Sequence, residues 1–406
     1  MSERLEGARI LVYSHDTFGL GHLRRCRAIA HSLVERFKGL SVLILSGSPI
    51  IGSFDFRARV DFVRIPGVIK LHNGEYQSLG LHIALDQTME MREAIIRHTA
   101  ESFRPDLFLV DKEPLGLNGE ALPTLQMLKS KGARLVVGLR DILDEPELLS
   151  HEWESKQVMP ALADLYDEIW VYGLPEIADP LEGLDCPLPV RAKMVYTGYI
   201  RRTLPSLDSA SHVRGGDEPF VLVTVGGGGD GMTVVDWVLR AYESDPHIPL
   251  AAVVVLGPFM SQPQQRRFRE RAERIGRVRV ITFDSHMELL MARAAGVVAM
   301  GGYNTFCEIL SFDKRAILIP RVAPRREQLL RAARAAGLGL VRMLDVEQSA
   351  DTGQMVAALR ELPGQPAPSR MGAGRMLRGL ETINRIVAGR LRGRLRPGVS
   401  RKAAAG

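Results

Sequence analysis

The chain has 406 residues, of which 46% are hydrophobic and 25% charged, and this composition is typical of a globular protein. At about 150 residues per folding unit, the length predicts two or three domains. The net charge of +6 is a small surplus of 53 basic over 47 acidic residues, which argues against a nucleic-acid partner, and the absence of any run of ~18 apolar residues excludes a membrane-spanning helix.

The N-terminus and the cysteines indicate the cellular compartment of the protein. The first six residues carry acids and lead directly into a strand-like segment, so we expect no secretory signal and a cytoplasmic protein. Cys26, Cys186 and Cys307 are far apart and lack CxxC spacing, which argues against disulfides and against a structural zinc site. We expect them to be small buried side chains.

Short β-branched runs alternate with helical stretches, as in the βαβ units that build parallel sheets. The first series covers residues 9–13, 42–45, 60–65, 106–110, 134–139, 168–172 and 193–197. The second covers residues 220–225, 250–256, 278–283, 296–300, 316–319 and 338–343. Most are apolar on both faces, as buried parallel strands must be. We therefore predict an α/β chain of two tandem, doubly wound, Rossmann-like domains.

The boundaries follow from composition. Residues 201–219 are polar and rich in Pro, Gly and Ser, so they predict a linker. We expect an N-terminal domain over residues 1–200, a second domain over residues 220–370, a C-terminal helix over residues 371–391 and a basic, disordered tail over residues 392–406. Between residues 385 and 402 there are seven basic residues and no acid. A solvated tail and contact with an anionic membrane surface, which would place the protein peripherally at the inner membrane face, both remain open.

Ligands of doubly wound sheets bind at the carboxyl ends of the strands, and three glycine-rich stretches follow predicted strands there. They are residues 18–22, 226–231 and 301–305. The second stretch satisfies GxGxxG, but Gly257 and Pro258 stand where a dinucleotide enzyme needs a ribose-binding acid. No P-loop, HExxH or DxD pair is present. We therefore expect no metal or other cofactor, and a bound phosphate must be neutralised by backbone amides and helix ends.

The third stretch suits a diphosphate. Gly301 and Gly302 follow a strand, and Asn304 and Thr305 open a helix, so backbone amides and a helix N-terminus face any ligand there. Glu308 lies one turn later on the same face, where its carboxylate could accept both hydroxyls of a ribose. The alternative is a surface helix with an ordinary Asn or Thr cap and a solvated glutamate.

These residues carry a family resemblance. The run GGYNTFCE at residues 301–308, followed by Pro320 and by Glu327-Gln328, resembles the donor-binding motif of GT-B nucleotide-sugar glycosyltransferases, above all glycosyltransferase family 28. The resemblance implies that the glycines and the helix start hold the diphosphate, Glu308 the ribose, and Glu327 with Gln328 the donor sugar. The donor-binding residues it implies are Gly227, Gly228, Phe283, Gly301, Gly302, Asn304, Thr305, Glu308, Glu327 and Gln328. For Phe283, a core aromatic is the competing interpretation.

The first glycine stretch resembles the same family more weakly. It places His15, Gly19 and Gly21 on the acceptor side, and Asp141, after the strand at residues 134–139, could read acceptor hydroxyls or be a solvated helix cap. Residues 19–26 also match the GxGHxxRC motif of nucleotide-sugar hydrolases of pseudaminic acid synthesis.

A transfer without a metal needs a base that removes the proton of the acceptor hydroxyl, and His22 has a suitable pKa. Asp111 follows the strand at residues 106–110 and would orient His22, like the pair of plant GT-B transferases. The alternatives are a structural His22 and His15 as the base.

The expected function is a metal-independent, inverting glycosyltransferase. It would move a hexose, N-acetylhexosamine included, from a UDP-sugar to a glycan, lipid-linked or small-molecule acceptor. The alternatives are a nucleotide-sugar hydrolase of the pseudaminic acid pathway type, a UDP-sugar epimerase and a non-catalytic nucleotide-sugar-binding protein.

Overall fold

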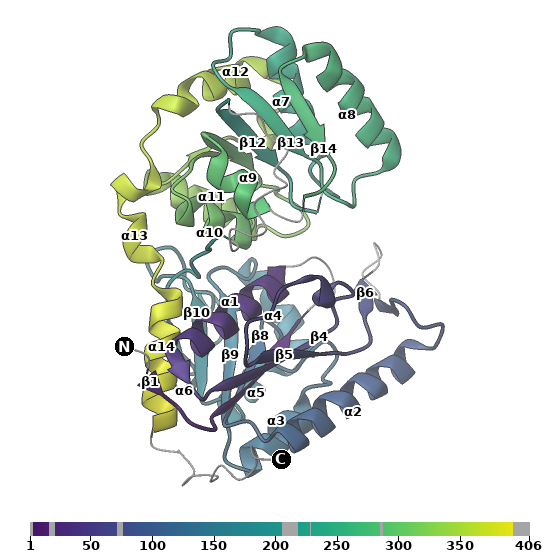
Figure 1. The fold of residues 1–406 in the computed structure, drawn as a ribbon, viewed down its shortest axis with the longest axis vertical. Helices are drawn as coiled ribbons and strands as arrows, with labels where there is room; N and C mark the ends of the chain where they lie inside the picture. Colours follow the sequence, from purple (N-terminus) through teal and green to yellow (C-terminus); the bar gives the residue numbers. More distant parts are fainter. Residues whose placement is uncertain are drawn as a thin grey trace, which may run out of the picture. The chain divides into compact units, whose positions relative to one another are not determined.

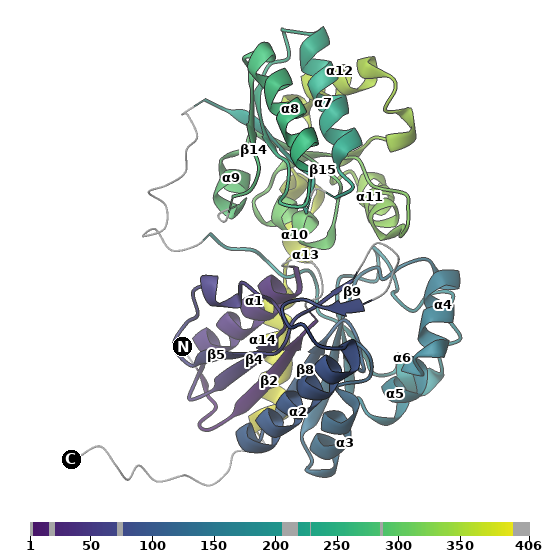
Figure 2. The same cartoon turned by 90° about the vertical axis from the view of Figure 1, so that its right-hand side faces the viewer.

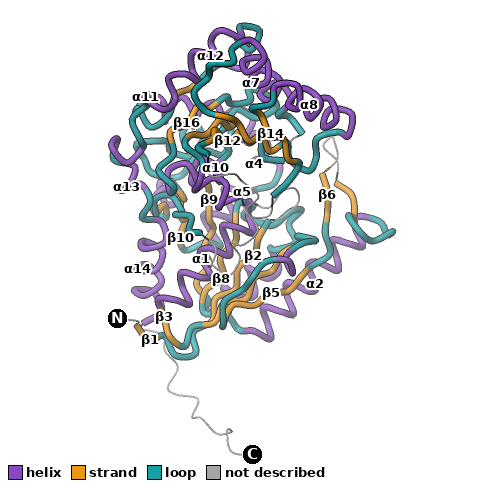
Figure 3. The backbone as a smooth tube through the Cα atoms, turned by 45° about the horizontal axis from the view of Figure 1, so that its top comes forward, coloured by secondary structure: helices purple, strands orange, loops and turns teal. Residues whose placement is uncertain are grey.

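The computed structural model describes residues 3–15, 21–70, 76–204, 218–227, 229–284 and 287–392. Contacts divide the chain into two compact domains, Met1–Ile200 with Arg378–Gly406, and Arg201–Leu377 (Figure 1). Each domain has a parallel sheet with helices packed around it, and the tube in Figure 3 shows the strands in orange. The predicted α/β fold class is confirmed. Most of the predicted linker and tail, residues 205–217 and 393–406, lies outside the described residues.

The sheet of the first domain has seven parallel strands in the order β11-β10-β9-β8-β2-β4-β5. They are β2 (Arg9–Ser14), β4 (Ser41–Ser46), β5 (Val60–Arg64), β8 (Leu107–Asp111), β9 (Arg134–Arg140), β10 (Glu168–Tyr172) and β11 (Met194–Tyr196). Each overlaps one of the seven runs predicted in the first half. The strand order reverses between β2 and β8, so this is the switch point at which a doubly wound sheet binds its ligand.

The other elements of the first domain surround this sheet. The helices are α1 (Gly21–Arg36), α2 (Leu85–Phe103), α3 (Leu122–Ser130), α4 (Pro146–Ser155), α5 (Val158–Asp164), α6 (Leu188–Arg191) and α14 (Gly379–Leu391), with a 3-10 turn at Ile51–Ser53. Two small pairs complete the domain, β1 (Glu3–Arg4) with β3 (Phe37–Lys38) and β6 (Val68–Lys70) with β7 (Tyr76–Ser78).

Helix α1 is fixed on both of its sides. Leu23, Cys26, Ala30 and Leu33 are three or four residues apart and fully buried, so they form the stripe that packs toward the sheet. The last helix of the chain, α14, lies beside α1 (Figure 1). There Asn384 donates from Nδ2 to the Ser32 hydroxyl over 2.9 Å. The first domain is therefore built from both ends of the chain.

The sheet of the second domain has six parallel strands in the order β14-β13-β12-β15-β16-β17. They are β12 (Phe220–Thr224), β13 (Ala251–Val255), β14 (Val278–Ile281), β15 (Gly296–Ala299), β16 (Arg315–Leu318) and β17 (Arg342–Met343). This is the dinucleotide-fold order, and its switch point lies between β12 and β15.

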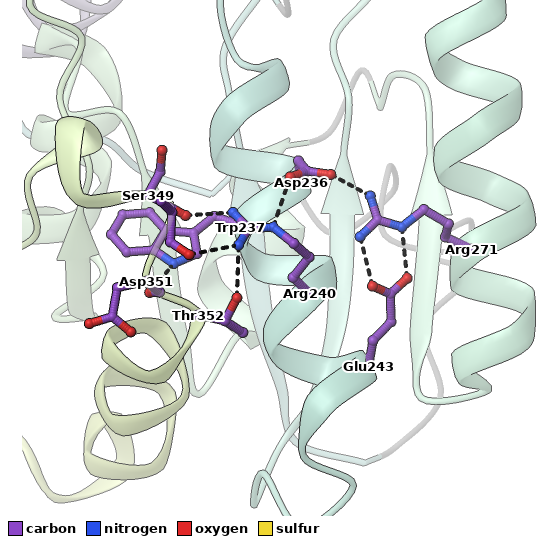
Figure 4. Close-up of polar contacts among 9 residues, drawn as sticks. Asp236, Trp237, Arg240, Glu243, Arg271, Ser349, Asp351 and Thr352 are labelled. Atoms are coloured by element: carbon purple, nitrogen blue, oxygen red, sulfur yellow. Dashed lines mark hydrogen bonds and ion pairs between the residues drawn. The ribbon is translucent and has the colours of Figure 1, made fainter.

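Helices of the second domain flank this sheet, and α7, α8 and α12 lie side by side (Figure 2). The helices are α7 (Met232–Ser244), α8 (Gln262–Ile275), α9 (Met287–Arg293), α10 (Tyr303–Ser311), α11 (Glu327–Gly337), α12 (Thr352–Glu361) and α13 (Ala373–Met376), with 3-10 turns at Val346–Gln348, Leu362–Gly364 and Pro368–Met371. Arg271 of α8 bonds Glu243 and Asp236 of α7, and Arg240 of α7 donates to Thr352 of α12 over 2.8 Å (Figure 4). These charged contacts fasten the helices to one another.

Two predicted elements differ from the structure. The strand predicted at residues 338–343 is reduced to Arg342–Met343, because the amide of Leu340 bonds the carbonyl of Ala335 and closes the end of α11. Leu340 and Val341 of the apolar run are nevertheless buried, whereas Leu338 is exposed. The helix predicted at residues 371–391 is broken after Met376, where Leu377 leaves the helical conformation, and its longer part, α14, belongs to the first domain.

The cysteines are free thiols. Cys26 and Cys307 are buried as predicted, but the prediction for Cys186 is wrong, since that side chain is partly exposed. It lies in the irregular segment before α6, and such connections run over protein surfaces. No helix in the described parts of the chain combines the length and the apolar character needed to cross a bilayer.

Candidate functional site

The switch point of the first domain brings His22 and Asp111 together. Asp111 is the last residue of β8 and fully buried, and His22 is in the first turn of α1. His22 Nδ1 lies 2.6 Å from Asp111 Oδ2, and the His22 side chain is 16% exposed. The contact that the sequence predicted is therefore present, and a histidine that still reaches solvent is backed by a buried carboxylate.

The protonation state of His22 follows from its neighbours. Burial lowers the pKa of His22 to about 4, and the positive charge of Arg25 acts in the same direction while Asp111 acts against both. Burial acts to raise the pKa of Asp111, but Arg25 and His22 hold it well below its usual range. At neutral pH, Asp111 is a carboxylate and His22 is neutral. An ionised carboxylate can only accept a hydrogen bond, so His22 Nδ1 carries the proton and donates the hydrogen bond to Asp111. Nε2 is then the nitrogen that can accept a proton.

Arg25 is the third member of this cluster. It lies one helical turn after His22 on α1 and is 1% exposed. Its Nε donates to Asp111 Oδ1 over 2.9 Å and its Nη2 to Asp111 Oδ2 over 2.7 Å, a two-pronged contact that fixes the carboxylate plane. The guanidinium also lies over the Tyr172 ring, with 5.2 Å from Cζ to the ring centre. This buried support was not predicted from the sequence.

His15 lies next to this cluster. It follows β2 at the switch point, and its ring meets the His22 ring edge-on at 5.7 Å. Burial lowers the pKa of His15 well below its ordinary value, and its Nδ1 is buried without a hydrogen-bond partner in the described chain. Lys112, directly after Asp111, has a left-handed φ of 74°, a conformation that non-glycine residues adopt mostly at constrained sites.

The other acceptor-side residues have different positions. Asp141 is fully buried and accepts a 2.8 Å hydrogen bond from the Tyr199 hydroxyl, so the solvated-cap interpretation is wrong. Asp141 directly follows β9, and its side chain is inaccessible to water. Gly21 is the first residue of α1, and Gly19 lies outside the described residues.

Two glycine loops pack against each other at the switch point of the second domain. Gly227 follows β12, and its carbonyl accepts from the amide of Phe259 over 2.9 Å. Gly257 follows β13 with a φ of 86°, and a Cβ there would lie 2.4 Å from the carbonyl carbon of Gly227. A ribose-binding acid at this position would collide with the first loop. Gly228 lies outside the described residues.

The third glycine loop follows β15 on the other side of the switch point and leads into α10. Gly301 has a φ of 81°, and Gly302 caps the helix without a side chain. The first turn of a helix leaves N–H groups that no helix carbonyl satisfies, and they favour an anion. Asn304 and Thr305 are in this first turn but are not the cap, because the helix starts one residue earlier, at Tyr303.

Buried arginines hold this third loop in place. Arg331 of α11 is fully buried and donates from Nη1 to the carbonyl of Gly301 over 3.1 Å. Arg202, 7% exposed, donates from Nη2 to Asn304 Oδ1 over 2.5 Å. Both contacts add positive charge near the N-terminus of α10, which increases its preference for an anion.

Two donor-side alternatives are decided by exposure. Glu308 is 4% exposed on α10, so the interpretation as a solvated surface glutamate is wrong. Phe283 follows β14 and is 52% exposed, so it is not a core aromatic. An aromatic side chain exposed at the carboxyl end of a strand is available to stack on a ligand.

Glu327 and Gln328 begin α11, beyond β16, and share Arg321 as a partner. Arg321 donates from Nη2 to Glu327 Oε1 over 2.8 Å and from Nη1 to Asp230 Oδ2 over 2.7 Å. Its backbone amide donates to Gln328 Oε1 over 3.4 Å. Glu327 is 4% exposed, and its Oε2 is buried without a hydrogen-bond partner among the described residues. Buried polar atoms usually have a hydrogen-bond partner, so this oxygen is available to accept a hydrogen bond from a ligand.

The residues that sequence reasoning missed are all arginines. They are Arg25, Arg202, Arg321 and Arg331. Only Arg25 had a signal, since it belongs to the GxGHxxRC match and lies three residues after His22 on a helix. Among the described residues, no group of three or more His, Cys, Asp or Glu side chains is arranged to hold a metal ion.

Comparison with protein families bears on the second domain. Residues 220–373 match the model of the glycosyltransferase family 28 C-terminal domain. This range contains the glycine loops that follow β12, β13 and β15. The second domain is therefore similar to the C-terminal domain of glycosyltransferase family 28.

Solved structures match over nearly the whole chain. The glycotransferase of kitacinnamycin has a TM-score of 0.64 at 17% identity, with 95% of this chain and 99% of that chain covered. The spinosyn forosaminyltransferase SpnP has 0.61 at 15% identity, with 96% and 99% covered. Medicago truncatula UGT71G1 complexed with UDP-glucose has 0.61 at 11% identity, with 95% and 98% covered. At these identities the likeness shows the fold, which is GT-B.

The chain is a glycosyltransferase with a GT-B fold. The family match supplies the activity class and the structural likeness extends the fold to the first domain, where the family model does not reach. No curated protein sequence matches the chain.

Proposed function

We propose that this glycosyltransferase transfers a hexose from UDP-sugar to a hydroxyl acceptor with inversion at the anomeric carbon. The observation that carries the proposal is the pairing, within one chain, of a family 28 donor domain with a neutral His22 backed by Asp111. The UDP-glucose bound to the Medicago truncatula relative supports the choice of donor class. The acceptor carries a hydroxyl group and is either a glycan, a lipid-linked acceptor or a small molecule.

The donor half of the proposal uses the second domain. The amides of the loop at Gly301-Gly302 and of the first turn of α10 would bind the diphosphate, aided by the positive charges of Arg202 and Arg331. Glu308, one turn further along α10, would accept the ribose hydroxyls. Glu327 Oε2 would accept a hydroxyl of the sugar, which satisfies a buried oxygen that otherwise lacks a partner. Phe283 would stack on the uracil.

The acceptor half uses the first domain. The acceptor oxygen attacks the anomeric carbon and forms the new C–O bond, while the bond from that carbon to the UDP oxygen breaks. His22 Nε2 takes the proton of the hydroxyl, and Asp111 stabilises the resulting imidazolium. The electron pair of the broken bond remains on UDP, whose charge the helix N-terminus stabilises.

A hydrolase is the second candidate, because His22, Arg25 and Cys26 match the nucleotide-sugar hydrolase motif and all three lie on one helix. In that reaction water replaces the acceptor hydroxyl, and the sugar is released free. The same residues would serve, so the product distinguishes the two reactions.

Incubation with a panel of UDP-sugars tests the proposed reaction. We expect UDP release that depends on a hydroxyl acceptor and a glycoside product with the opposite anomeric configuration, read by NMR. Free sugar at full rate without an acceptor would establish the hydrolase. Absence of turnover with every donor, together with calorimetric binding of UDP, would indicate a binding protein.

Turnover is expected to survive chelation. The sequence lacks a DxD pair, and the proposed diphosphate site uses amides and arginines. UDP release in 5–10 mM EDTA should therefore stay within about twofold of the untreated rate. Loss of turnover in EDTA that magnesium or manganese restores would contradict this leaving-group mechanism.

A further inference from the structure

We propose that Arg25 is the positioning residue of the His22–Asp111 pair, and that its permanent charge adds to burial in favouring the neutral form of His22 that can accept a proton. The inference rests on the proposed role of His22 and goes beyond it, since it concerns how the pair is held and tuned. Its first support is geometric. Arg25 occupies both oxygens of Asp111, at 2.9 and 2.7 Å, so the carboxylate cannot rotate away from His22.

The second support is the burial of the cluster. Asp111 is fully buried and Arg25 is 1% exposed, so their charges are poorly screened by water. An isolated carboxylate in this position would favour the protonated form of His22, as a buried imidazolium–carboxylate pair. Arg25 supplies the compensating charge in advance, because a guanidinium does not lose its proton in proteins. His22 is then free to remain neutral.

The third support comes from the surroundings of the guanidinium. The Arg25 Nη2 atom lies 2.9 Å from His22 Nδ1, so the charge stands directly against the ring. Tyr172 lies under the guanidinium, and a Cβ at Gly138 would fall 2.0 Å from the Tyr172 hydroxyl oxygen. Arg25 is thus held from below by a ring that can reach its position only over a glycine.

Other charged groups also face His22, and they set the background against which Arg25 acts. Lys112, after β8, lowers the pKa of His22 and Asp111 raises it, while His15 stands edge-on to the ring. Of the cations, Arg25 has the larger influence. Removal of Arg25 should therefore raise the pKa of His22, and the remaining charged groups should not cancel this rise.

The test measures the His22 ring by NMR as a function of pH, with the His22→Gln variant to assign the signal. In Arg25→Met, we expect the pKa of His22 to rise by about one unit or more, and the acid limb of UDP release from UDP-glucose or UDP-N-acetylglucosamine to move by the same amount. Each unit costs about tenfold in rate at pH values on that limb. Raising the pH should restore part of the loss. The matched control is Arg36→Met, which removes an exposed arginine from the same helix and should leave both measurements unchanged.

The Arg25→Lys variant separates charge from geometry and serves if methionine is not tolerated. Lysine keeps the charge but cannot form the two-pronged contact, so the pKa of His22 should stay near its wild-type value while kcat falls at least tenfold. An unchanged His22 titration in folded Arg25→Met, or wild-type kcat in Arg25→Lys, would overturn the inference. If His22→Ala itself retains wild-type kcat, the proposed function has failed instead, and the NMR titration still reports on Arg25 separately.

Discussion

Replacing His22 with alanine is expected to lower kcat by about 10²–10⁴, the range for loss of a general base. Affinity for UDP should be nearly unchanged, because the donor residues belong to the other domain. Turnover is measured as UDP release, and affinity by calorimetry. A merely structural histidine would instead lower the melting temperature with little change in kcat per folded molecule.

The pKa of His22 also predicts the direction in which the rate changes with pH. The pKa of His22 is lowered to about 4, so the ring is neutral above that pH and gains a proton as the pH falls through it. The rate should therefore be flat toward neutral pH and fall only on the acid side, well below the pKa of about 6.5 of an ordinary histidine. The His22→Ala variant should lack this acid limb.

His31 provides the matched control, since it lies on the same helix, accepts from the amide of Arg57 at 3.4 Å and meets the Phe56 ring edge-on at 6.2 Å. The His31→Ala variant should keep wild-type kcat and the acid limb. A stable His22→Ala protein with wild-type kcat would remove His22 from the catalytic role, and His15 would then be the next candidate.

Replacing Glu308 with alanine is expected to weaken UDP binding by about 1.5–3 kcal/mol, the scale for a hydrogen bond to a charged partner. In dissociation constants this is about 10- to 150-fold. The effect should be large because Glu308 is buried, where water cannot replace the lost contact. Calorimetry with UDP and with uracil alone should show the loss only for the ligand that carries the ribose.

Two variants frame this measurement. Glu308→Gln keeps one acceptor oxygen, so its affinity should lie between those of wild type and alanine. Glu270→Ala removes an exposed glutamate from α8 and should leave UDP affinity unchanged. Unchanged affinity in a folded Glu308→Ala protein would exclude Glu308 from the donor site.

Much of the fold could be predicted because buried parallel strands have sequences that are largely apolar on both faces. Residues 168–172 and 220–225 show this, since every position of β10 and β12 is buried. Glycine stretches mark where parallel strands end, so they also indicated the edge of each sheet at which a ligand would bind. His22 and Asp111 are 89 residues apart, yet their places after two strands of one sheet were enough to predict that they meet.

The rest depends on information that no local pattern contains. Arg202, Arg321 and Arg331 look like ordinary basic residues in sequence, and only the folded chain shows them bonded to the donor loops. The domain to which a helix belongs is equally invisible locally. The spacing of apolar residues in α14 predicts a helix, but its partner α1 lies more than 340 residues earlier in the chain.

The return of α14 to the first domain has a consequence for synthesis. When the ribosome has completed residue 377, the second domain has its entire chain, whereas the first domain still lacks the helix that lies against α1. The usual order, in which N-terminal domains are complete first, is reversed. Until residues 378–391 have emerged, the nascent protein has a finished second domain and a first domain whose α1 is uncovered.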